Sequence, residues 1–293
     1  MNTAAKLLSF STALTLVFLA ALWAGTLTAG SGGLALPATI ADKHTAALGP
    51  DAGLKMETAG LVATAAGFTL VPRGPTTFVP GVPAELAFVV TGLGGRAVTG
   101  FDVVNEQLLD VVVVRRDGTR FQRLEPVLGP GGVWRAPMTL PAAGVYRAYA
   151  DFVPVGGPEL VLGIDLSVSG DFVPEVLRPT RVAQVDGYTV RLDTDLVAGS
   201  RSEVFVAIDH DRLPVTDVER RHGTLGQLVV LRQSDLSSLR VAPAPAVAAA
   251  AHGPGLAFTV EIPAAGMHRL FLEFQHEGVV HTAEFTVQTG SDQ

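Results

Sequence analysis

The sequence predicts an all-β protein, in which two tandem β-sandwich domains follow an N-terminal hydrophobic helix. First, apolar residues make up 48% of the 293 residues and charged residues only 17%, and long Glu-, Lys- and Leu-rich stretches suited to helices are missing. Second, the chain repeats itself at an offset of about 120 residues. Third, apolar and polar residues alternate between turn signals spaced about 8–12 residues apart, which is typical of sandwiches and barrels.

The repeat defines the predicted domains. Gly67-Phe68-Thr69-Leu70 matches Gly187-Tyr188-Thr189-Val190, and Pro141-Ala142-Ala143-Gly144 recurs as Pro263-Ala264-Ala265-Gly266. Two units are too few for a solenoid, which needs at least three repeats. We therefore expect one sandwich over residues 61–170 and another over 181–290. Prolines interrupt strand pairing in the segment between them.

One corner indicates the type of sandwich. Residues 146–152 read YRAYADF, so Tyr146 and Phe152 share one face of a strand with the alanines between them. Gly144-Val145-Tyr146 resembles the corner at which an immunoglobulin-type strand begins with a tyrosine bonded to the preceding loop. His268 takes the place of this tyrosine in the second repeat. Both predicted domains are therefore immunoglobulin-like β-sandwiches.

The N-terminus predicts export. Leu7 to Ala24 is almost wholly apolar, and as a helix it would extend about 27 Å, close to the thickness of a bilayer core. We interpret residues 1–30 as a signal peptide or a membrane-anchor helix, and cleavage stays open because no plain A-x-A motif is present. Residues 31–60 are expected to form a flexible linker. The predicted location is extracytoplasmic, either anchored in the cell membrane or secreted, and the membrane is a partner of this segment.

Charge and composition exclude several functions. The net charge of −7 argues against nucleic acid as a partner. The absence of cysteine excludes disulfides, thiolate catalysis and zinc–thiolate sites. No G-x-S-x-G elbow, phosphate-binding loop or H-E-x-x-H motif is present. The sequence therefore predicts a non-enzyme with no catalytic residue, cofactor-binding residue, metal ligand or cofactor, and His268 is expected to be a buried corner residue.

Part of the chain resembles a known family. Residues 101–126 (FDVVNEQLLDVVVVRRDGTRFQRLEP), with Trp134 and the run around Tyr146, are similar to predicted exported actinobacterial proteins with YtkA-like, immunoglobulin-type domains, often labelled heavy-metal-associated. The resemblance implies this fold and an extracytoplasmic location. It also implies metal-binding histidines in the relatives, which none of the matching positions holds here, so no ligand is carried over. Those positions are Asn105, Asp110, Arg123 and Glu125, with Gln227, Arg240 and Ala242 in the second repeat.

The first four positions suggest a polar cluster. If Asp117-Gly118 closes a hairpin, Asp110 comes opposite Glu125 and Arg123 lies on the same face. Arg123 would then serve as an internal cation between two carboxylates. The alternative is a set of solvated charges on the sandwich surface. Outward-facing pairs are also expected within strands, Arg147 with Asp151 and Arg269 with Glu273.

These observations leave three classes of function. The first is a non-enzymatic binding or interaction module of the cell envelope, whose partner is an unknown protein or small ligand. The second is a heavy-metal (copper-type) handling protein of the extracytoplasmic space with a degenerate site. The third, an enzyme with an unrecognised site, has the least support because no catalytic motif is present.

Overall fold

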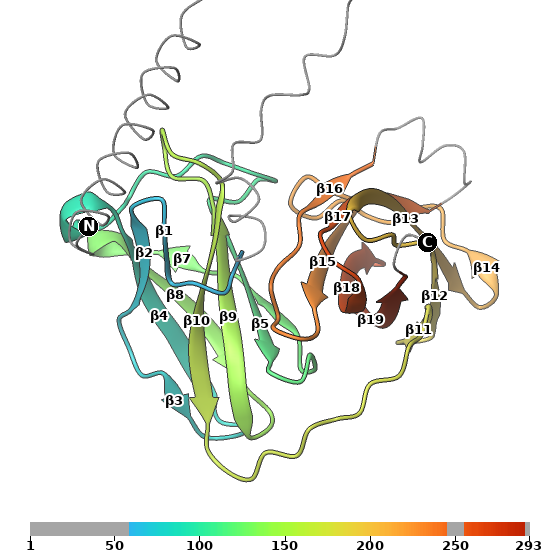
Figure 1. Ribbon diagram of the computed structural model, residues 1–293, viewed down its shortest axis with the longest axis horizontal. Coiled ribbons are helices and arrows are strands. Elements are labelled where there is room, and N and C mark those ends of the chain that lie inside the picture. The colour runs from blue at the N-terminus through green and yellow to red at the C-terminus, as the bar shows by residue number, and fades with distance from the viewer. Residues whose placement is uncertain (1–58, 245–254, 291–293) are drawn as a thin grey trace, which may run out of the picture. The chain divides into compact units, whose positions relative to one another are not determined.

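A computed structural model describes residues 59–244 and 255–290 of the chain. The predicted N-terminal helix and all but the last residues of the predicted linker lie outside these ranges. No helix long and apolar enough to cross a membrane occurs within them. The described residues fold as strands joined by turns and two short 3₁₀ turns, Leu93–Gly95 and Pro130–Gly132, which confirms the predicted all-β class (Figure 1).

The first sandwich is built by the first repeat. One five-stranded sheet has the order β1-β2-β4-β8-β7, and the other has the order β3-β10-β9-β5-β6. The strands of the first sheet are β1 (Thr64–Ala65), β2 (Phe68–Pro72), β4 (Pro83–Thr91), β8 (Val133–Thr139) and β7 (Val127–Leu128). Those of the second are β3 (Thr77–Phe78), β10 (Leu160–Val168), β9 (Gly144–Phe152), β5 (Leu109–Arg115) and β6 (Gln122–Leu124).

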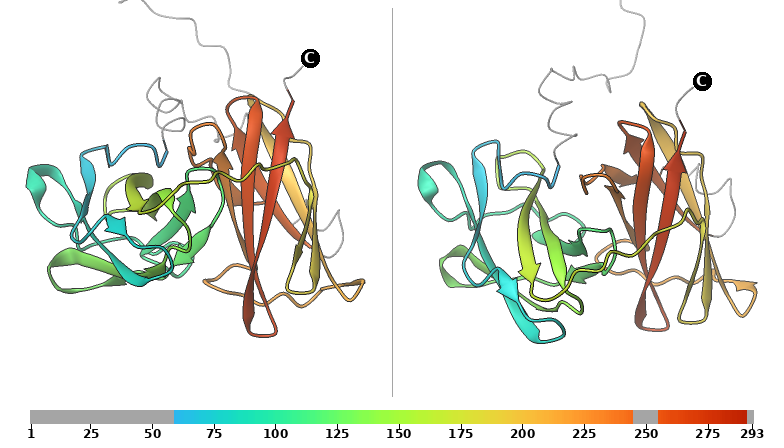
Figure 2. Two further views of the ribbon diagram at one scale, coloured as in Figure 1. Left: turned by 90° about the horizontal axis from the view of Figure 1, so that it is seen from below. Right: turned by 60° about the horizontal axis from the view of Figure 1, so that its bottom comes forward.

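The second sandwich also consists of two sheets (Figure 2), but one of them has only three strands. One sheet has the order β11-β12-β13-β17-β16, with β14 pairing β13, and the other has the order β15-β18-β19. The first sheet contains β11 (Val182–Val185), β12 (Tyr188–Asp193), β13 (Ser200–His210), β14 (Leu213–Pro214), β17 (Leu256–Ile262) and β16 (Val241–Pro243). The other contains β15 (Gly226–Arg232), β18 (Gly266–His276) and β19 (Val279–Thr289).

Equivalent positions of the repeat hold equivalent strands. β9 begins at Gly144 and β18 at Gly266, and both glycines have a positive φ that other residues rarely adopt. The Tyr146 hydroxyl donates to the Ala142 carbonyl at 2.9 Å, which forms the predicted corner. His268 fills the equivalent place and is fully buried. The hydrogen bond of Tyr146 and the strand order together identify the immunoglobulin-like sandwich.

Each sandwich encloses its own core. The first core is centred on Phe88, Trp134 and Tyr146, and the second on Phe258, Phe274 and Phe285, all of them buried. These side chains come from alternate positions of facing strands, which explains the period-two pattern of the sequence. Burial of such large apolar side chains, each contributing roughly 1.5–3 kcal/mol, stabilises a fold that has no disulfide.

A third apolar cluster joins the two sandwiches, which belong to one compact unit. We call this set the interface cluster. Phe121 and Phe271 stack with their ring centres 4.5 Å apart, and the buried Tyr149 hydroxyl donates to the Leu236 carbonyl at 2.6 Å. The remaining buried members are Val112, Val114 and Leu231. The strands that face each other here are β5 and β9 of the first sandwich and β15 and β18 of the second.

Candidate functional site

The charged cluster predicted around Arg123 lies beside the interface cluster. Arg123 is the middle residue of β6, and only 4% of its side chain is exposed. It forms ion pairs with Asp110 of β5 and Glu273 of β18. Burial alone would lower the pKa of Arg123, but the two carboxylates outweigh this effect and raise it. The arginine is therefore an internal cation that joins both sandwiches, and its second partner is Glu273.

Glu125 lies elsewhere than the hairpin argument suggested. The ladder pairs Val112 with Arg123, which agrees with the expected register. β6 ends at Leu124, however, and the Glu125 side chain forms an ion pair with Arg221 of the second sandwich. Asn105 has a positive φ in the turn closed by Val104 and Gln107. Within the described residues, no side-chain hydrogen bond or ion pair connects Asn105 to the cluster.

The expected pairs within single strands are wrong. Arg147 pairs with Asp165, which lies opposite it on β10, and not with Asp151. Arg269, buried at 3% side-chain exposure, pairs with Glu284 on β19. Residues four apart on a strand are roughly 13 Å apart, too far for an ion pair, whereas residues on neighbouring strands are about 5 Å apart. Asp151 and Glu273 therefore do not pair with Arg147 and Arg269, and both can act on the cluster around Arg123.

Asp151 is the most perturbed carboxyl of this region. It lies opposite Asp110 in the ladder between β5 and β9. Desolvation by the surrounding protein and the nearby Asp110 and Glu159 carboxylates raise the pKa of Asp151 to about 7, while Asp151 itself is an exposed residue. The Oδ1 atom of Asp110 is buried and has no hydrogen-bond partner. Asp110, which Arg123 binds, thus lies opposite a second carboxyl group at the junction of the sandwiches.

Three histidines of the second sandwich, His210, His276 and His281, form a separate group around Tyr188. Tyr188 donates to or accepts from His276 Nδ1 at 2.8 Å, and its ring packs against His210 and His281. The carboxylate of Asp217 lies 3.1 Å from His276 Nε2, and the carboxylate of Asp186 lies 2.9 Å from His281 Nδ1. Through these contacts the imidazoles connect neighbouring turns of the sandwich. Across residues 59–244 and 255–290, no group of three His, Cys, Asp or Glu is arranged to hold a metal.

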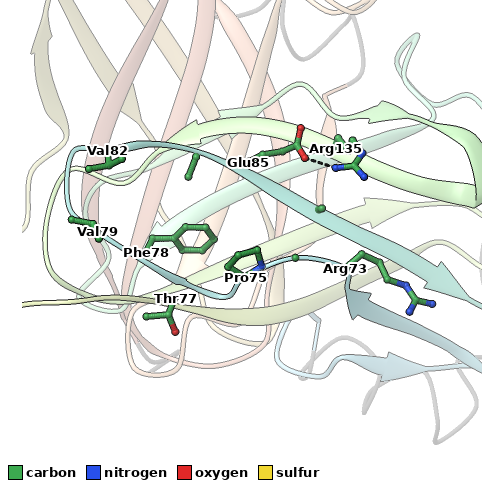
Figure 3. Close-up of a pocket in the computed structure, with 11 residues that line it drawn as sticks. Arg73, Pro75, Thr77, Phe78, Val79, Val82, Glu85 and Arg135 are labelled. Carbon is green, nitrogen blue, oxygen red and sulfur yellow. Dashed lines mark hydrogen bonds and ion pairs between the residues drawn. The ribbon is translucent and has the colours of Figure 1, made fainter.

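A groove of about 520 Å³ lies on the first sandwich, where the chain crosses from β2 to β3. We call it the β3 groove. Pro75, Phe78, Val79 and Val82 supply apolar side chains, and the valines are 58% and 51% exposed (Figure 3). At the other side Arg135 pairs with Glu85 at 2.5 Å, and Arg73 stands exposed at the entrance. No sequence pattern predicts this groove, because its residues come from a strand crossing that only the fold brings together.

The edge of β3 is open for pairing. The carbonyls of Thr76 and Phe78 accept hydrogen bonds from the backbone N–H of Ser167 in β10 and of Ser169 just after it. Because successive backbone groups of a strand alternate in direction, the N–H and C=O of Thr77 point away from β10. β3 is the last strand of its sheet. The groove therefore combines an apolar surface, an exposed arginine and an outward-facing backbone.

A comparison with known sequence families gives one match, to the second part of the chain. Residues 183–291 match a family described as a domain of unknown function, DUF8832. A comparison with curated protein sequences gives no match.

A comparison with solved structures matches most of the chain to several proteins at low identity. The fibronectin(III)-like modules of Clostridium thermocellum CbhA match at 11% identity and a TM-score of 0.21, over 76% of this chain and 95% of theirs. A Salmonella alpha-2-macroglobulin mutant matches at 18% identity and a TM-score of 0.25, over 78% of this chain and 15% of its own. Invasin, a bacterial integrin-binding protein, matches at 10% identity and a TM-score of 0.25, over 78% and 41%. With scores this low, the fold assignment depends on the strand pairings of this chain.

Proposed function

We propose that this chain is a non-enzymatic binding module of the cell envelope, and that its β3 groove receives an extended polypeptide segment of a protein partner. The observation that carries the proposal is the open edge of β3 beside an apolar groove. An extended peptide can add a strand to such an edge while its alternate side chains enter the groove. A small ligand would leave the outward backbone groups of Thr77 unused.

The charge of the groove indicates the chemistry of the partner. Arg73 is exposed and, among the residues that the structure describes, forms no ion pair. Arg135 is already paired with Glu85. A segment with apolar residues at alternate positions and one acidic residue near Arg73 would complement the groove. The apolar N-terminal segment supplies the export that a role in the envelope needs, with the module either anchored or released.

Several features support a role without catalysis. Arg123, Asp110 and Glu273 bind one another at the junction of the sandwiches, and they do not line the β3 groove. The groove holds no histidine and only one carboxylate, Glu85, which its arginine neighbour neutralises. General acid–base or nucleophilic chemistry needs a reactive group with a base at hydrogen-bonding distance. The groove offers shape and charge instead.

A selection of peptides from a random displayed library on the purified full chain tests this function. We expect the selected peptides to alternate apolar residues and to carry an acidic one. Val82→Glu and Arg73→Glu should each weaken binding about tenfold or more, equivalent to about 1.4 kcal/mol. Val182→Glu is the matched control, since Val182 is an exposed strand valine of the second sandwich. Selection of no peptide, or equal losses in all three variants, would reject the groove as the binding site.

A further inference from the structure

We propose that Asp110 and Asp151 share one proton at mildly acidic pH, and that this proton stabilises the junction between the two sandwiches. The inference concerns the cluster around Arg123 and does not depend on binding in the β3 groove. It starts from the strand register, because β5 and β9 place the two residues directly opposite each other. Opposed side chains on neighbouring strands have Cβ atoms about 5 Å apart, close enough for their carboxyl groups to hydrogen bond.

A missing hydrogen bond indicates where the proton lies. One Asp110 oxygen, Oδ2, binds Arg123, while the other, Oδ1, is buried without a partner. A buried acceptor without a donor costs about 1–3 kcal/mol. A protonated Asp151 carboxyl supplies such a donor from the adjacent strand. Desolvation and the Asp110 charge also raise the pKa of Asp151 to about 7, so this carboxyl holds its proton at mildly acidic pH.

The charges facing the pair come from four elements. Arg123 of β6 is the near cation, and Glu273 of β18 is its other partner. Glu159, in the β9–β10 connection, and Arg240, before β16, also act on the charge of Asp151, and they pair with each other at 3.1 Å. When Asp151 loses its proton, three carboxylates compete for one buried guanidinium. The added negative charge opposes Glu273, and Glu273 is the residue that connects Arg123 to the second sandwich.

The sign of the pH dependence follows from the raised pKa. Between the ordinary aspartate range near 4 and a pKa near 7, the joined state binds the proton more tightly than a state in which the junction has opened. Opening therefore becomes easier as pH rises through this window, by at most about tenfold per pH unit for one proton. Above about pH 7 both states are deprotonated, and the effect levels off.

Amide hydrogen exchange of the full chain tests the proposal, with β15 and β18 as reporters and Asp151→Asn as the main variant. The asparagine amide can donate to Asp110 but cannot titrate. The measured quantity is the ratio of the opening equilibrium constant of these strands in the wild type to that in Asp151→Asn at the same pH. This ratio should rise by up to about tenfold per pH unit and level off near pH 7. Asp102→Asn, which replaces an exposed aspartate of the same sandwich, should follow the wild type.

A second measurement removes the dependence on variants. Carboxyl-carbon NMR of the wild-type full chain should show Asp151 titrating near neutrality. A ratio of wild-type to Asp151→Asn opening that stays constant from about pH 5 to about pH 8 would overturn the proposal. So would titration of Asp151 in the ordinary range near 4.

Discussion

Replacement of Arg123 by methionine is the most direct test of how the two sandwiches are joined. Arg123 has 4% of its side chain exposed, and its partners Asp110 and Glu273 have 27% and 9% exposed. Breaking a buried ion pair by removing one partner costs about 3–5 kcal/mol, since the remaining charges stay buried without compensation. Asp110 keeps some solvent contact, which places the expected loss at the lower end, about 3 kcal/mol.

Thermal unfolding of the full chain at one fixed pH measures this loss. A two-sandwich unit of this size loses about 2–4 °C in Tm per kcal/mol, so Arg123→Met should lower Tm by roughly 6–12 °C. Arg135→Met is the matched control, because it breaks an ion pair whose side chains are 56% and 50% exposed. Exposed pairs contribute about 0–1 kcal/mol. Adding Asp110→Asn and Glu273→Gln to Arg123→Met should recover much of the loss, because no unpaired charge remains. A loss in Arg123→Met no larger than that in Arg135→Met would refute the reasoning.

Three further predictions concern single positions and metal. Tyr146→Phe removes the corner hydrogen bond to Ala142 and should cost about 1–3 kcal/mol in urea unfolding, whereas an unchanged midpoint would mean that the bond is redundant. Burial lowers the pKa of His268 from 6.5, so the unfolded chain binds a proton at a pH at which the folded chain does not. The free energy of unfolding should therefore fall as pH drops below about 6.5, and His268→Gln should make this decline less steep in unfolding measured across pH. Copper added to the full chain should be lost on dialysis, because the described residues hold no group of metal ligands; retention of one equivalent, measured by elemental analysis, would instead favour the metal-handling function.

Local patterns were sufficient to predict much of the fold. The repeat, the alternation within strands and the tyrosine corner are each set by residues near one another in sequence or by one face of a strand. The pairing of Arg123 with Asp110 was also accessible, because a short hairpin fixes the register of its two strands. For the same reason, the strands carrying these residues could be expected to lie side by side.

Contacts between the sandwiches were not accessible in this way. Glu273 lies 150 residues from Arg123, and no local pattern connects the two positions. The predicted partners of Arg147 and Arg269 failed because spacing along one strand was used in place of the register between strands. The β3 groove was missed for a related reason: its wall is made by a chain that changes sheets, and alternation describes a strand only while it stays in one sheet.

The interface cluster has a consequence for the separate halves of the chain. Its two sides are repeat equivalents: Val112 and Val114 correspond to Val229 and Leu231 by strand position, and Tyr149 corresponds to Phe271. The same patch thus meets itself across the junction, as it does in an isologous homodimer. A first sandwich expressed without its neighbour would expose this patch to water, and two copies could bury it by meeting face to face. Because both patches belong to one chain, each patch always has its partner in a one-to-one ratio, whereas separate copies would have to associate by diffusion.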